Sequence, residues 1–99
     1  MVKRKIIWSP GAKIDQFKIL DYYYKRNGNK TYSQKLYKRF QNAVRLLIKH
    51  PEIGVHTDMK DIRSLVEGDY AIFYRINQNS IEIISIWDCR QDPERLTIE

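Results

Sequence analysis

Residues 62–93 contain three runs in which the side chains alternate with a period of two, and residues typical of tight turns separate these runs. This alternation is the pattern of β-strands, because successive side chains of a strand point to opposite faces of a sheet. Glu67-Gly68-Asp69 divides the first run from the second, and residues 77–80, Asn-Gln-Asn-Ser, divide the second from the third. The stretch therefore predicts a three-stranded β-meander, against which the rest of the chain has to pack.

The second turn also predicts the register of the two strands that it joins. A two-residue loop at Gln78-Asn79 would place Arg75 opposite Glu82, and this meeting of opposite charges favours the register over a slip by one residue. The same register predicts the pairs Ile76–Ile81, Tyr74–Ile83, Phe73–Ile84, Ala71–Ile86 and Tyr70–Trp87.

Both faces of the predicted meander are largely apolar. One face carries Ile72, Tyr74, Ile76, Ile81 and Ile83, and the other carries Ala71, Phe73, Ile84 and Ile86. The helices of a small domain can cover one face. We therefore expect a partner to bury the second face, or the second face to form a binding surface.

A short strand at Lys3–Trp8 and a first helix are predicted before the meander. Ser9 can cap this helix with Pro10 at its first position, and the helix is expected to run to about Tyr24. Its predicted core stripe is Ile14, Phe17, Leu20 and Tyr24. Three bulky residues remain outside this stripe, where either the second helix or a partner covers them: Ile19, Tyr22 and Tyr23.

A second helix is predicted from a capping box at Thr31 and Gln34 to about His50, where Pro51 stops it. Its core residues are expected to be Leu36, Phe40, Ala43, Val44 and Leu47. A basic stripe on the opposite side suits a phosphate backbone, an acidic peptide or plain solvation, and consists of Lys35, Lys38, Arg45 and Lys49. Residues 51–61 are predicted to be a loop with exposed His56 and Asp58, two residues that lack a third metal ligand.

The elements together predict one α+β domain over residues 1–99, in the order β-α-α-β-β-β, with a helical hairpin on one face of an antiparallel sheet. The net charge of +6 indicates attraction to polyanions or to an acidic protein. One cysteine, Cys89, allows no internal disulfide and favours a reducing cytoplasm, and no stretch is long and apolar enough to cross a membrane. Signatures of nucleotide, metal and serine-hydrolase sites are absent from the sequence, so no cofactor and no metal are expected.

Arginine, tyrosine and aspartate side chains gather on the meander and its exit. Arginine forks suit phosphate groups, whereas RNA cleavage would also need a general base and a general acid, and no histidine is expected nearby. Arg63 and Arg90 are predicted to lie near each other, where Arg63 either binds a target or pairs with Asp88 or Asp92. The weak catalytic candidates are Arg63, Arg90, Asp88 and Tyr74, and the target-binding candidates are Arg63, Arg75 and Arg90.

Arg63 is followed by GDYAIFYRI at residues 68–76, IEIISIWD at residues 81–88 and CRQDP at residues 89–93. With the order of elements, these segments resemble the RelE/ParE superfamily of toxins from bacterial type II toxin–antitoxin systems. The resemblance covers nearly the whole chain. It implies a cytoplasmic growth inhibitor, associated with plasmid stabilisation and neutralised by a cognate antitoxin.

The superfamily divides by target, since RelE-like members cut mRNA within the ribosome and ParE-like members inhibit DNA gyrase without being nucleases. RelE-like enzymes have basic residues where this chain has Ile62, Ser64 and Ala71, and the segment FYRI is closer to ParE proteins. The resemblance therefore favours a ParE-like toxin that is not an enzyme. A ribosome-dependent mRNA endoribonuclease and a non-toxic, partner-binding relic of the fold are the alternatives.

The antitoxin that the resemblance implies is expected to be acidic and to cover apolar surface that the chain does not bury itself. The residues predicted to bind it are Ile19, Tyr22, Tyr23, Phe73, Ile84 and Ile86.

Overall fold

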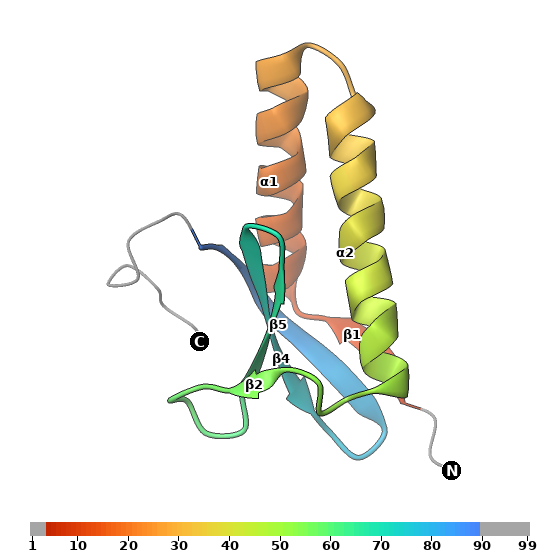
Figure 1. Ribbon diagram of the computed structural model, residues 1–99, viewed down its shortest axis with the longest axis vertical. Coiled ribbons are helices and arrows are strands. Elements are labelled where there is room, and N and C mark those ends of the chain that lie inside the picture. Colours follow the sequence, from red (N-terminus) through yellow and green to blue (C-terminus); the bar gives the residue numbers. More distant parts are fainter. Residues whose placement is uncertain (1–3, 90–99) are drawn as a thin grey trace.

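The computed structural model describes residues 4–89 and has an α+β fold in which a helical hairpin lies on one face of a sheet (Figure 1). The helices are α1 (Pro10–Asn27) and α2 (Thr31–Lys49). The predicted fold class, hairpin and meander are confirmed. The strands form one sheet in the order β1-β5-β4-β3-β2, and they are β1 (Lys5–Trp8), β2 (Val55–His56), β3 (Arg63–Glu67), β4 (Tyr70–Ile76) and β5 (Ser80–Asp88).

The sheet differs from the predicted one at both of its edges. It is mixed rather than antiparallel, because β1 pairs with β5 in parallel, and the long connection that a parallel pair requires runs through both helices and then through β2, β3 and β4. At the other edge, β2 lies within the predicted loop of residues 51–61 and pairs with the start of β3. Two residues are too few for a periodic pattern in the sequence.

A β-bulge divides the pairing of β4 with β5 into a predicted half and a shifted half. From Ile76–Ile81 to Tyr74–Ile83 the register is as predicted, and Arg75 and Glu82 form an ion pair of 3.5 Å. The remaining predicted pairs are wrong by one residue, because Ile84 is an extra residue on β5. The pairs beyond the bulge are Phe73–Ser85, Ile72–Ile86, Ala71–Trp87 and Tyr70–Asp88.

The start of α1 supplies hydrogen bonds to β5 where β1 has ended. The hydroxyl of Ser9, which caps α1 by accepting from Ala12 N–H at 3.0 Å, donates to Ile84 O at 2.9 Å. The carboxylate of Asp15 accepts from Ile86 N–H at 3.1 Å and from the Ser85 hydroxyl at 2.9 Å. The bulge is therefore held by two side chains of α1, which take the place of a neighbouring strand.

The helix ends also differ from the prediction. α1 continues beyond Tyr24 to Asn27 and stops at Gly28, whose φ of 72° lies in the left-handed region that glycine adopts without strain. The predicted capping box is wrong, because Thr31 is already helical and Lys30 precedes it without a side-chain cap. The side chain of Asn29 accepts a hydrogen bond from Thr31 N–H instead.

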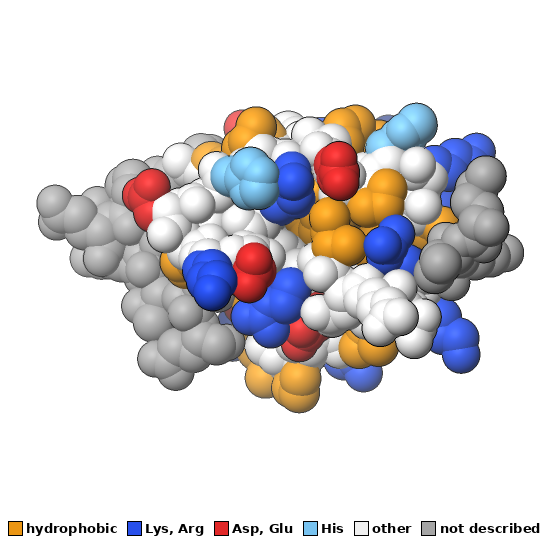
Figure 2. Space-filling model, turned by 90° about the horizontal axis from the view of Figure 1, so that it is seen from below, with side chains coloured by type: hydrophobic (Ala, Val, Ile, Leu, Met, Phe, Trp, Pro, Cys, Tyr) orange, Lys and Arg blue, Asp and Glu red, His pale blue; other side chains and the backbone are white. Residues whose placement is uncertain are grey.

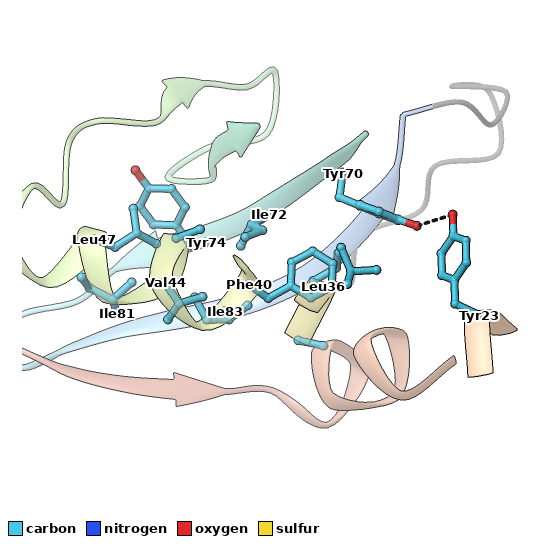
Figure 3. Close-up of a cluster of buried hydrophobic side chains, with 13 residues drawn as sticks. Tyr23, Leu36, Phe40, Val44, Leu47, Tyr70, Ile72, Tyr74, Ile81 and Ile83 are labelled. Carbon is cyan, nitrogen blue, oxygen red and sulfur yellow. Dashed lines mark hydrogen bonds between the residues drawn. The ribbon is translucent and has the colours of Figure 1, made fainter. Parts of the chain in front are cut away.

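The main core lies between the sheet and α2 (Figure 3). All five predicted core residues of α2 are buried, and Phe40 packs edge to face against Tyr70 with ring centroids 5.4 Å apart. Ile86 also belongs to this core and is 4% exposed. Its predicted place on the opposite face is wrong, since the bulge shifts the register by one residue and thereby turns the side chain over.

The predicted core stripe of α1 is wrong for Ile14, Phe17 and Tyr24, and Leu20 is its one member that packs against the core. Ala12 and Tyr23 are buried, and Ile19 and Leu20 pack against the core. Phe17 is 67% exposed, and Ile14 and Tyr24 are exposed as well. Because α1 has apolar residues all round, its periodicity alone does not decide which side faces the sheet.

The second face of the sheet is covered in part by the chain itself. Ile62, Ala71 and Phe73 form a smaller cluster, against which Met59, Ile84 and Trp87 pack. Phe73 is only 6% exposed. The expectation that a partner must bury this part of the sheet is therefore wrong, because side chains of the segment before β3 and of β5 itself pack together on this face.

Candidate functional surfaces

Tyr74 is buried and holds the loop between α2 and β2. Its hydroxyl donates to Pro51 O at 2.7 Å and accepts from Gly54 N–H at 2.9 Å. Burial raises the pKa of this phenol above its ordinary value of 10.0, although the hydrogen bond with Gly54 and the charge of Arg63 act in the opposite direction. Tyr74 therefore stays protonated and out of reach of a substrate, which disfavours its predicted catalytic role.

Arg63, the first residue of β3, also holds this loop in place by hydrogen bonds. One terminal nitrogen donates to Glu52 O at 3.2 Å and Gly54 O at 2.9 Å, and the other lies 3.1 Å from Nε2 of His56. Because a guanidinium group only donates, this contact is a hydrogen bond only in the tautomer of His56 whose Nε2 accepts. The expectation that no histidine lies near the arginines is wrong, since β2 pairs His56 directly with Arg63.

The remaining predicted site residues do not meet at Arg63. Arg63 lies opposite Tyr74, whereas Asp88 lies opposite Tyr70, four residues along β4 and thus about 13 Å away. The predicted pairing of Arg63 with Asp88 is therefore wrong. Arg75 is engaged with Glu82. Arg90 and Asp92, and with them the predicted proximity of Arg63 and Arg90, lie outside the described residues.

The end of the molecule that carries both histidines has a surface of mixed character. Figure 2 shows apolar side chains there among lysine or arginine and acidic groups. A hollow of about 640 Å³ lies in this region and is lined by Arg4, His50, Pro51, Glu52, Ile53 and Ile76. The guanidinium group of Arg4 is held in place, because its Nε donates to Asn77 O at 2.9 Å.

The predicted antitoxin-binding residues are mostly parts of the two cores. Tyr23 and Ile86 belong to the main core, Ile19 packs against it, and Phe73 and Ile84 belong to the cluster on the second face. Tyr22 remains accessible and is 55% exposed. It lines a hollow of about 400 Å³ beside the ends of β4 and β5, together with Lys18, Ile19, Tyr23, Arg26, Tyr70 and Asp88.

An apolar groove that the sequence prediction missed runs between the two helices. Phe17, Tyr24 and Tyr37 are all exposed there, and Lys30 Nζ lies 5.9 Å from the centre of the Tyr24 ring. The Ser33 hydroxyl donates to Leu20 O at 2.7 Å and ties the two helices together beneath it. The groove has a volume of about 360 Å³ and is lined by Phe17, Leu20, Asp21, Tyr24, Lys30, Ser33, Gln34 and Tyr37.

The signal for this groove was present in the sequence but was assigned to the core. Phe17, Leu20 and Tyr24 recur at helical spacing, and they were expected to face the sheet. Ala12 and Tyr23 mark the opposite side as the buried one, because the short Ala12 lets α1 approach β5 closely.

Residues 4–89 contain no group of three or more histidine, cysteine, aspartate or glutamate side chains that could hold a metal ion. Within the same residues, neither helix is long and apolar enough to cross a membrane.

Comparison with solved structures gives two toxin–antitoxin systems with the same fold. The chromosomal ParDE system from P. aeruginosa superposes with a TM-score of 0.76 at 19% identity, covering 87% of this chain and 96% of that chain. The E. coli DinJ-YafQ toxin-antitoxin complex superposes with a TM-score of 0.54 at 14% identity, covering 88% of this chain and 93% of that chain. The curated proteins contain no match.

The sequence model of one family matches residues 6–93, which is most of the chain. Its description is "ParE toxin of type II toxin-antitoxin system, parDE". The match confirms the resemblance seen in the sequence and its ParE-like side, and the chain belongs to the ParE toxin family of type II toxin–antitoxin systems.

Proposed function

We propose that this protein inhibits bacterial growth by binding an essential target, with DNA gyrase as the first candidate, and that a cognate acidic antitoxin neutralises it. Membership of the ParE toxin family supports the toxin role. The single structural observation that carries the antitoxin part is the exposed apolar groove on the helical hairpin of a protein with a net charge of +6.

The groove suits a segment with an apolar side and an acidic side. Phe17, Tyr24 and Tyr37 present aromatic surface to water, and its burial by a partner would be favourable at roughly 25 cal/mol per Å² of apolar area. Lys30 borders the groove, and the charge of the whole molecule attracts carboxylates. An amphipathic acidic helix laid between α1 and α2 would satisfy both features.

The accessible chemistry favours binding over RNA cleavage. Tyr74 is buried, Arg75 is paired with Glu82, and Arg63 already donates to two carbonyl groups. His56 is the exposed titratable group that lies in contact with Arg63.

One observation supports the ribosome-dependent endoribonuclease as a second candidate. His56 is exposed beside Arg63, so a histidine side chain and an arginine side chain, two residue types that can serve RNA cleavage, lie in contact. The His56→Ala variant tests this directly. The endoribonuclease requires that this variant lose toxicity while it remains folded.

Induction in bacteria separates the three hypotheses. We expect growth arrest with altered supercoiling of a reporter plasmid and no new mRNA ends in primer extension. In-frame mRNA cuts would establish the endoribonuclease instead. Unimpaired growth under full expression of the folded protein would leave only the non-toxic relic.

A substitution in the groove tests neutralisation separately from toxicity. Phe17→Glu adds a charge at an exposed position, so the protein should fold and stay toxic while the antitoxin encoded beside it no longer rescues growth. Ile7→Glu is the matched control, because Ile7 is also exposed but lies on β1, away from the hairpin groove. Equal rescue of both variants would show that the antitoxin does not use the groove.

A further inference from the structure

A cationic ridge runs along the outer side of α2. Lys38, Arg45 and Lys49 are separated by seven and four residues, which places them in one column on a helix of 3.6 residues per turn. Each lies on the side opposite the buried Phe40 and Leu47. Lys35 flanks the column, and the four charges span about 21 Å along the helix axis.

The charge of α2 is not balanced on the helix itself. Its 19 residues include no aspartate or glutamate, whereas α1 contains Asp15 and Asp21. Arg39, on another side of α2, pairs with Glu67 at 3.2 Å. The four side chains of the ridge are exposed and form no ion pair with any residue that the structure describes.

The ridge is separate from the hairpin groove. The groove uses Ser33, Gln34 and Tyr37 of α2 and Lys30 immediately before it, and none of these belongs to the ridge. Figure 1 shows α1 and α2 side by side, and the four ridge residues of α2 are exposed. A ligand could therefore lie along the ridge while the groove is occupied.

We propose that the ridge of Lys35, Lys38, Arg45 and Lys49 binds the phosphate backbone of double-stranded nucleic acid, independently of base sequence. Protein interfaces need a cluster of apolar anchors at their centre, whereas the ridge has polar Asn42 between Lys38 and Arg45 and a single exposed apolar neighbour, Leu46, between Arg45 and Lys49. Phosphate contacts need only lysine or arginine charges and amide or hydroxyl donors. This proposal goes beyond growth inhibition and antitoxin binding, because it gives the toxin a nucleic-acid surface of its own.

Fluorescence anisotropy with a labelled 24-base-pair DNA duplex tests the proposal over a range of salt concentrations. Four phosphate contacts give a slope of log K against log salt of roughly −3.6, so affinity should fall on the order of 100-fold between about 50 and 200 mM salt. The variant Lys38→Gln, Arg45→Gln, Lys49→Gln should reduce the magnitude of this slope by roughly 2.7. All three positions are exposed, so its melting temperature should equal that of the wild type.

The matched control removes the same charge elsewhere. Lys18→Gln, Arg26→Gln, Lys60→Gln lowers the net charge by the same amount at three exposed positions outside α2, and it should keep the wild-type slope. Equal losses in both triple variants would overturn the proposal, because net charge and not the ridge would then account for binding. Absence of binding at about 50 mM salt would also overturn it.

Competition with polyglutamate distinguishes nucleic acid from acidic proteins. If the ridge is specific for phosphate backbones, polyglutamate at equal charge concentration should displace the labelled duplex at least tenfold less effectively than unlabelled duplex does. Equal displacement would assign the ridge to acidic proteins and overturn the nucleic-acid proposal.

Discussion

Tyr74→Phe isolates the contribution of one hydroxyl to the loop that joins α2 to the sheet. The change removes the hydrogen bonds with Pro51 O and Gly54 N–H while the ring and its packing remain. Gly54 is buried, and no space beside Tyr74 is left for a larger residue, since a Cβ on Gly54 would lie 2.5 Å from the Tyr74 hydroxyl. The N–H of Gly54 would therefore lose its partner without gaining access to water.

The expected loss of stability follows from the Gly54 N–H group, which is left without a hydrogen-bond acceptor. A buried donor without an acceptor costs about 1–3 kcal/mol, and the loss of the bond with Pro51 adds roughly 0.5–1.5 kcal/mol. The sum corresponds to a fall in melting temperature of at least about 6 °C for a domain of this size. Urea unfolding should show a lower midpoint with an unchanged slope, because the surface exposed on unfolding is the same.

A pH series supplies a second signature of the same hydroxyl. The pKa of Tyr74 is raised in the folded state above 10.0, so its stabilising effect is complete below that pH and is lost as the pH rises through the folded-state pKa. Wild-type stability should fall above about pH 10 through this group, and the Phe variant should lack that part of the fall. Tyr22→Phe is the matched control, because the Tyr22 hydroxyl is exposed and only accepts from Arg26 at 3.4 Å. A loss below about 0.5 kcal/mol in Tyr74→Phe, or one equal to that of Tyr22→Phe, would refute the view that this hydroxyl holds the loop.

Four further substitutions test other parts of the structure. Phe40→Ala should cost about 3–5 kcal/mol and Leu47→Ala about 2–5 kcal/mol in chemical denaturation, because both side chains are fully buried; values well below these would mean that α2 packs differently. Asp15→Ala should cost about 1–3 kcal/mol by leaving Ile86 N–H without an acceptor, and faster hydrogen exchange of the Ile86 amide would localise the effect to the bulge. Arg63→Ala should lower the melting temperature, since its guanidinium group bonds two loop carbonyls; loss of toxicity at an unchanged melting temperature would instead assign Arg63 to target binding.

The sequence predicted those parts of the fold in which a local pattern is compatible with only one arrangement. The α2 stripe was assigned correctly because its five core residues recur at helical spacing and lysine and arginine residues occupy the opposite side of the helix. The register at Arg75 and Glu82 was correct because the nearby turn and the charge pair agree. Both are local signals, contained within one element or one hairpin.

The errors arose where contacts distant in sequence decide the structure. The bulge at Ile84 depends on Ser9 and Asp15, about 70 residues earlier in the chain, so no pattern within β5 reveals it. The neighbourhood of His56 and Arg63 depends on the two-residue strand β2, which is too short to be recognised. The bulge places Ile86 in the main core. The strand β2 places His56 beside Arg63, where the sequence predicted no histidine.

The misassigned stripe of α1 bears directly on function. A helix that only had to cover the sheet would need apolar residues on one side, yet α1 presents Ala12, Ile19 and Tyr23 to the core and Ile14, Phe17 and Tyr24 to solvent. Exposed aromatic surface promotes aggregation, so a chain retains it at little cost only when something covers it for much of the time. Apolar residues on two sides of α1 made it difficult to predict which side faces the sheet. The same composition is expected of a helix that packs on its own sheet with one side and on a partner with the other.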